Sequence, residues 1–179
     1  NDTVLRVATG KLRYLFCGAI ICAVAPSVVA QAASEMDSYA KKVSAEKSLV
    51  AYWRFQGDLK DAKGKLDGVA KAGDPQFAEG PAGGRALSLR KGRFVTMGSA
   101  PELDLPETTI EFWFKPVFAK GAVQYSPCIV SKRGQGQPSR FSIHISNAYS
   151  DLTVWNGSAA TPYPGEDMKL EPELWYLGA

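Results

Sequence analysis

Short segments in which apolar and polar side chains alternate recur from residue 48 to the end of the chain. Gly, Pro, Asn or Asp bound these segments, and a period of two assigns successive side chains to opposite faces of an extended strand. After residue 48 no stretch has apolar residues at helical spacing. We therefore expect an all-β fold of many short antiparallel strands, arranged as a β-sandwich.

The segment TTIEFWFKP, residues 108–116, places three aromatic rings in consecutive positions. In an extended chain Ile110, Phe112 and Phe114 line one face, whereas Trp113 stands on the other. We expect the first face to belong to the core. Trp113 then either packs under a neighbouring loop or offers a stacking platform, and large aromatic side chains are most often used for packing.

Further strands are expected at residues 49–55, 66–70, 86–89, 93–98, 128–132, 140–146, 152–155, 159–163 and 174–177. The clearest alternation is RFSIHIS at residues 140–146, which predicts Phe141, Ile143 and Ile145 facing inward with the polar residues between them facing outward. Asn-Gly at residues 156–157 is a strong signal for a type I′ turn between two of these strands.

Length and charge limit the classes of partner. A chain of 179 residues is long enough for one ordinary core, and its hydrophobic content is 45%. Three of the 21 basic residues, but only one of the 18 acidic residues, lie in residues 1–32. The remainder is therefore nearly neutral, and we expect no nucleic-acid partner, because such partners select basic surfaces.

Residues 1–32 have the layout of upstream residues followed by a secretory signal peptide. Lys11 and Arg13 precede an apolar run that finishes in the small residues AQA at positions 30–32. The alternative is a membrane anchor, because residues 14–30 carry no charge and reach the short limit for a span. The small-residue end favours cleavage. We expect a secreted, periplasmic or cell-surface protein that contacts a membrane only through an uncleaved signal segment.

Residues 33–47 separate this signal from the β domain, which we place at residues 48–179. Apolar residues at helical spacing predict a short helical linker here, with Ser34 as its cap and Asp37 three residues later.

Cys128 is the one cysteine outside the signal segment, so the β domain is expected to have no intrachain disulfide. Apolar neighbours favour a small buried residue over a nucleophile. The chain has a single histidine, His144, and no motif pairs it with Cys128.

Five patches of the sequence together resemble a known family. They read SLVAYWRFQGDLKDAKGKLDGVA, GGRALSLRKGRFVTMG, TTIEFWFKP, IVSKRG and ELWYLGA. In this order and spacing they resemble the LamG-like, concanavalin A-like jelly-roll domains of secreted bacterial proteins, from about residue 48 to the end of the chain. The resemblance implies a jelly-roll sandwich and corresponds to the following residues: Trp53, Phe55, Gly57, Asp61, Gly64, Gly68, Gly84, Ala86, Leu87 and Trp113.

The chain also departs from the family. Members often carry Asn-His-Gly where this chain has LDG at residues 66–68, and an Asp-rich turn where it has RKG at residues 90–92. Both differences weaken the transfer of a ligand or calcium role. The strand in ELWYLGA normally leads into several further strands, whereas the sequence ends at Ala179. The resemblance therefore implies a domain whose C-terminal strands are missing.

No pattern points to catalysis. Glycoside hydrolysis requires two carboxylates facing one cleft, which on a strand means acids at alternate positions. Glu111 is followed at the next alternate position by Trp113, and the acidic cluster at residues 166–173 lies among prolines and a glycine. We expect no enzyme here. The alternative is a fragment of a concanavalin A-like glycoside hydrolase whose catalytic residues lie outside this chain.

A calcium site is one interpretation of the acidic turn after residue 57. Asp58, Asp61 and Asp67 would supply carboxylate oxygens, which Ca²⁺ prefers. Three lysines interleave with these acids and reduce the negative charge of the turn. Turn capping by Asp58 and Asp61 is therefore the favoured alternative.

The leading hypothesis for function is a non-catalytic, extracytoplasmic binding or adhesion module for a glycan or an extracellular protein. Aromatic rings on strand faces and rim loops can stack on the apolar faces of sugars. The candidate ligand-binding residues are Tyr52, Trp113, Tyr125, Trp155 and Tyr163. A purely structural accessory domain is a further alternative.

Overall fold

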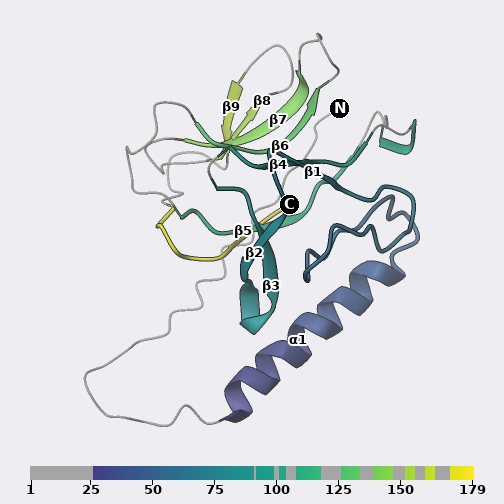
Figure 1. The fold of residues 1–179 in the computed structure, drawn as a ribbon, viewed down its shortest axis with the longest axis vertical. Helices are drawn as coiled ribbons and strands as arrows, with labels where there is room; N and C mark the ends of the chain where they lie inside the picture. Colours follow the sequence, from purple (N-terminus) through teal and green to yellow (C-terminus); the bar gives the residue numbers. More distant parts are fainter. Residues whose placement is uncertain are drawn as a thin grey trace. The chain divides into compact units, whose positions relative to one another are not determined.

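The computed structural model contains one helix and a set of short strands (Figure 1). It describes residues 26–90, 92–98, 101–103, 108–117, 126–133, 139–146, 152–155, 160–163 and 170–179. The chain divides into two compact units, one formed by residues 15–106 and the other by residues 1–14 together with 107–179. The predicted β domain contributes to both units, and each is considered by itself.

Helix α1 (Pro26–Ala45) begins earlier than expected. The prediction that Ser34 caps the helix is wrong, because the helix is already continuous through that residue. Proline fits the first turn of a helix, and the alanines that follow it are strong helix formers, so the helix extends across the segment that resembles a cleavage region. Within the described part of the chain, no helix combines the length and apolar character needed to cross a membrane.

Two small antiparallel sheets make up the strands of residues 15–106. Strand β1 (Val69–Lys71) pairs with β4 (Phe94–Thr96), and β2 (Gln76–Glu79) pairs with β3 (Arg85–Ser88). A 3₁₀ turn at Pro81–Gly83 closes the second pair. The sequence did not predict β2, because QFAE lies between a proline and a glycine and has only one large apolar residue.

Residues 49–55, all of which the structure describes, form no strand, so this prediction is wrong. The backbone of Trp53 makes only an isolated bridge to Asp61. The indole Nε1 of Trp53 donates a 2.7 Å hydrogen bond to the carbonyl of Leu66, whose side chain is buried. The segment is therefore anchored by side chains that reach the following loop, and not by a ladder of backbone hydrogen bonds.

The carboxylate of Asp61 is the centre of this loop. Its Oδ1 accepts hydrogen bonds from the backbone N–H groups of Tyr52 and Lys63, and its Oδ2 accepts from those of Lys65 and Leu66, all between 2.8 and 3.2 Å. The side chain is only 4% exposed. Burial opposes ionisation, but the four N–H donors outweigh it and hold the pKa of Asp61 below its usual value.

The other unit contains a four-stranded antiparallel sheet in the order β6 (Cys128–Arg133), β7 (Ser139–Ile145), β8 (Leu152–Trp155) and β9 (Ala160–Tyr163), visible in green in Figure 1. A second sheet pairs β5 (Phe112–Phe114) with β10 (Tyr176–Gly178). Sequence alternation located these strands well, and the predicted bounds of β8 are confirmed. The predicted Asn-Gly turn between β8 and β9 lies outside the described residues.

The core of this unit joins the two sheets. Phe114 of β5, Ile145 of β7, Leu152 of β8 and Leu170 are buried together, with Phe112, Ile129 and Tyr176 packed against them. The ring of Phe114 stacks on that of Tyr176 with centroids 5.5 Å apart. The predicted core face of residues 110, 112 and 114 is therefore confirmed: Phe114 is buried, and Ile110 and Phe112 are half-buried.

Two details of the four-stranded sheet differ from expectation. Cys128 is exposed instead of buried, because it begins the first strand of the sheet. Ser142 lies on the outward side of β7 but is only 5% exposed, and its hydroxyl lies 2.8 Å from the Nε2 atom of His144. The described strands thus form small antiparallel sheets accompanied by one helix, in agreement with the all-β expectation.

Replacing Asp61 with Asn should lower the free energy of unfolding by about 2–4 kcal/mol. The amide nitrogen would face two backbone N–H groups that now donate to a carboxylate oxygen. Asp58→Asn is the matched control, because Asp58 is exposed and accepts one hydrogen bond, from the Lys60 N–H, so its cost should stay within about 0.5 kcal/mol. Urea denaturation measures both, and equal costs would contradict the role of Asp61.

Asp61 should also make stability depend on acidity. A carboxyl group with a lowered pKa in the folded state contributes its full stabilisation above the unfolded pKa of about 3.9, and that contribution is lost as the pH falls through the folded pKa. The unfolding free energy of the parent should therefore decline from about pH 4 downward, whereas the curve for Asp61→Asn should be flatter there. Parallel curves between pH 7 and pH 2.5 would contradict this prediction.

Candidate functional site

The structure describes the side chains of three of the five predicted ligand residues, Tyr52, Trp113 and Trp155. Tyr52 belongs to the unit of residues 15–106, where its backbone N–H is bound by Asp61 and its carbonyl accepts from the N–H of Ala62. Tyr125 lies outside the described residues. Tyr163 ends strand β9, but its side chain is not among those described.

Trp113 and Trp155 share one unit and the same exposed fraction, 39%, but they point to different surfaces. Trp113 neighbours Phe114 on β5, and Trp155 lies three positions after Leu152 on β8. Because Phe114 and Leu152 both enter the shared core, alternation directs each tryptophan outward from its own sheet. The structure therefore presents two separate aromatic surfaces in this unit.

The first surface is the outer face of the β5–β10 pair. Trp113 and Leu177 are direct cross-strand partners. One step further along, Lys115 lies with its Nζ atom 5.6 Å from the centroid of the Trp175 ring, which is a cation–π contact. We call the surface formed by Trp113, Lys115, Trp175 and Leu177 the tryptophan face.

Residues 171–173 hold the charged part of the tryptophan face in place. The N–H of Glu173 donates to the carbonyl of the buried Pro116 at 2.7 Å, and the N–H of Glu171 donates to the hydroxyl of Tyr176 at 2.7 Å. Glu173 adopts a positive φ of 63° and places its carboxylate 3.5 Å from the ammonium of Lys115. This ion pair contributes little stability because the Glu173 side chain is exposed, but it holds the Lys115 ammonium beside the ring of Trp175.

Sequence reasoning found Trp113 but missed Trp175 and Lys115. The segment ELWYL does alternate, which would have placed Trp175 and Leu177 on one strand face and Tyr176 on the other. What the pattern could not supply is the register of this strand against β5, about sixty residues earlier in the chain.

The second surface surrounds Trp155 on the four-stranded sheet. Trp155 lies across from Ser142, whose hydroxyl is 2.8 Å from the Nε2 atom of His144. The other ring nitrogen of His144 lies 3.2 Å from the carbonyl of Ser126, which fixes the tautomer: Nδ1 carries the hydrogen and Nε2 accepts from Ser142. This is a smaller aromatic surface with polar neighbours.

Cys128 and His144 are cross-strand partners, yet their side chains bind elsewhere. The thiol of Cys128 lies 3.4 Å from the carbonyl of Val130, and partial burial of the sulfur raises its pKa. A thiol that holds its proton is a poor nucleophile.

The aspartates proposed as calcium ligands bind protein donors. Asp61 accepts four backbone N–H groups, and Asp58 accepts one, so the turn-capping alternative agrees with the hydrogen bonds of both. Asp67 accepts the backbone N–H of Asp61 and the ammonium of Lys60, which lowers its pKa. Among the residues that the structure describes, no three His, Cys, Asp or Glu side chains are grouped to hold a metal ion.

Comparison with known proteins adds no relative: no family model, no curated protein and no solved structure matches the chain.

Gly178 allows β10 to lie close to the Phe112 ring of β5. A Cβ atom at this position would lie 2.8 Å from the Cζ atom of Phe112, whose ring packs against the core cluster. Gly178→Ala should therefore lower the free energy of unfolding by about 1–3 kcal/mol. In a double-mutant cycle with Phe112→Leu, the smaller side chain should relieve part of this cost. If the two losses of unfolding free energy are additive in urea denaturation, the alanine Cβ atom does not clash with the Phe112 ring.

Proposed function

We propose that this chain is a non-catalytic binding module that recognises a glycan outside the cytoplasm through its tryptophan face. The observation that carries the proposal is the exposed ring of Trp113 on the outer face of the β5–β10 pair, together with the cation–π contact of Lys115 with Trp175, which lies two residues before Leu177, the cross-strand partner of Trp113. Trp113 is 39% exposed although it is one of the largest apolar side chains.

The geometry suits a sugar. Pyranose rings present flat arrays of C–H groups that pack on indole faces, and their hydroxyls accept from or donate to nearby charged groups such as Lys115 and Glu173. Rings held on a strand lose little conformational freedom on binding, so their contact area is used efficiently. An indole ring exposed on a sheet face, with charged neighbours, therefore suits a polysaccharide.

We further propose that the fold is a concanavalin A-like jelly roll. Two observations support this. The two sheets of residues 107–179 enclose a common core, as the halves of a sandwich do. In the other unit, two glycines that carry the family resemblance occupy positions that disfavour a side chain. A Cβ atom on Gly68 would lie 2.8 Å from Val95, and Gly57 has a φ of 116°.

Export from the cytoplasm is part of the same proposal. Its support is the basic residues, apolar run and small-residue end within residues 1–32. A glycan-binding surface is of use where polysaccharides are found, at or beyond the cell surface.

A glycan array followed by calorimetry on the best ligand tests the function. Trp113→Ala and Trp175→Ala should each weaken binding by about 1–3 kcal/mol, by analogy with aromatic stacking on nucleobases. Trp155→Ala is the matched control, because Trp155 is equally exposed on the other surface, and it should leave affinity nearly unchanged. Circular dichroism should show each variant folded.

Three outcomes would overturn the proposal. Loss of affinity in Trp155→Ala alone would move the site to the four-stranded sheet. Binding of a protein with no glycan bound would replace the ligand class. Retention of full affinity in both Trp113→Ala and Trp175→Ala would remove the tryptophan face from recognition.

A further inference from the structure

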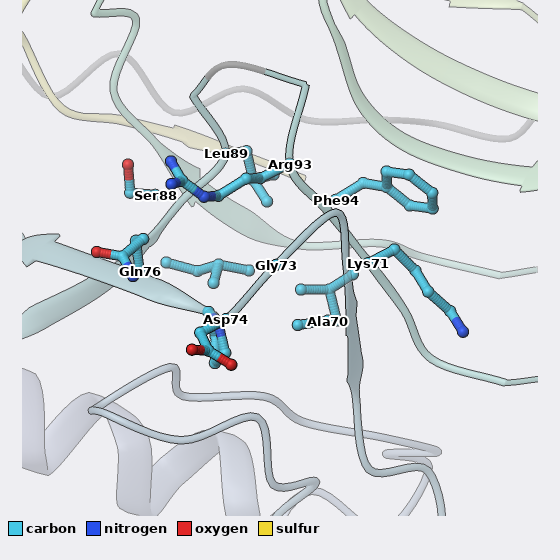
Figure 2. A pocket seen from close by; sticks show the side chains of 12 residues that line it. Ala70, Lys71, Gly73, Asp74, Gln76, Ser88, Leu89, Arg93 and Phe94 are labelled. Atoms are coloured by element: carbon cyan, nitrogen blue, oxygen red, sulfur yellow. The ribbon is translucent and has the colours of Figure 1, made fainter.

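The depression between the β1–β4 and β2–β3 pairs is too small for a sugar ring (Figure 2). It encloses about 10 Å³, which is room for about one water molecule. Lys71 and Arg93 line it together with Asp74, so charges of both signs border it. The charges that bear on glycan selection are therefore those around the exposed ring of Trp113.

Glu173 places a negative charge beside the tryptophan face. Its Oε2 atom lies 3.5 Å from the Nζ atom of Lys115, which is longer than the usual N–H···O hydrogen bond of about 2.7–3.2 Å. The Glu173 side chain is 61% exposed, and the Lys115 side chain 24%. A ligand that approaches from solvent therefore meets more of the glutamate than of the lysine, and both groups keep capacity for further hydrogen bonds.

The ammonium of Lys115 already has two partners. The carboxylate of Glu173 is one, and the ring of Trp175, with its centroid 5.6 Å away, is the other. Glu111, two residues before Trp113, is exposed and adds a second carboxylate. Glu111, Lys115 and Glu173 thus comprise two exposed glutamates and one half-buried lysine, and this balance opposes the binding of a further anion.

The backbone of Glu173 holds its carboxylate at this position. The N–H donates to the carbonyl of the buried Pro116 at 2.7 Å, and φ is 63°. This left-handed conformation is unfavourable for most residues other than glycine. The backbone alone therefore favours glycine here, and the glutamate side chain is present at some cost in stability.

We propose that Glu173 determines the charge class of the glycan, so that the tryptophan face accepts neutral sugars and rejects uronates. This inference rests on the proposed function. Lys115 lies two residues after Trp113, about 7 Å along an extended chain, a span that a sugar ring stacked on Trp113 can bridge. The hydroxyls of a neutral sugar can donate to the Glu173 carboxylate and accept from the Lys115 ammonium. The carboxylate of a uronate cannot donate, and Glu173 repels it.

The test compares neutral and acidic tetrasaccharides by calorimetry on the full chain at low ionic strength. The neutral probes are tetramers of glucose, mannose and galactose, and the acidic probes are tetramers of the corresponding uronates. The parent should prefer a neutral tetramer to its uronate counterpart by about fivefold or more. Glu173→Gln, which keeps the shape and removes the charge, should narrow this preference to about twofold or less.

Glu171→Gln is the matched control. Glu171 is exposed and belongs to the same segment, but it is the backbone N–H of Glu171 that donates to the Tyr176 hydroxyl. This variant should keep the preference of the parent. Lys115→Met should change it in the opposite direction from Glu173→Gln: the apolar stem stays, the ammonium is lost, and the preference for neutral tetramers widens because the glutamates lose their counter-charge.

The outcomes separate this inference from the proposed function. Absence of any glycan ligand, on the array and among the tetramers, would overturn both. Uronate tetramers that bind as tightly as neutral ones, or no binding of the tetramers alone, would overturn only the role of Glu173. So would an unchanged preference in Glu173→Gln, or an equal narrowing in Glu171→Gln. If Glu173→Gln does not fold, Glu173→Gly decides the matter, because glycine suits the backbone: it should keep the urea midpoint and lose the preference.

Discussion

The carboxylate of Asp61 is the interaction on which the unit of residues 15–106 depends. Four backbone N–H groups from two separate segments converge on its two oxygens. This arrangement brings Trp53 within reach of the Leu66 carbonyl and closes the loop that leads into β1. The charge is tolerated in a nearly inaccessible position because four backbone N–H groups donate to it in place of water.

This interaction also explains where sequence reasoning failed. Apolar and polar residues do alternate in residues 49–55, but the segment is held in place by side-chain hydrogen bonds instead of pairing with a neighbouring strand. Asp61 accepts the N–H of Tyr52, and the amide of Gln56 both accepts the N–H of Arg85 and donates to its carbonyl. A period of two predicts an extended segment, but it does not say whether the partner is a backbone or a side chain.

In residues 107–179 alternation predicted the burial of side chains more accurately, because the inward side chains of these strands pack in a shared hydrophobic core. Phe114, Ile145 and Leu152 are buried as their spacing predicts. Only part of the tryptophan face could be predicted from the sequence. The outward direction of Trp113 follows from local alternation, whereas its association with Trp175 and Lys115 depends on the register between β5 and β10, which local sequence does not encode.

Several residues that carry the family resemblance take part in loop hydrogen bonds or close backbone contacts. Trp53 and Asp61 supply loop hydrogen bonds, and Gly68 and Gly84 sit where a Cβ atom would meet Val95 or the amide of Gln56. None of these side chains belongs to the tryptophan face. Trp113 is the exception, since it belongs to the resemblance and yet stands on an outer face. Phe114 packs in the core, whereas the opposite side of β5 carries Trp113, which is 39% exposed there.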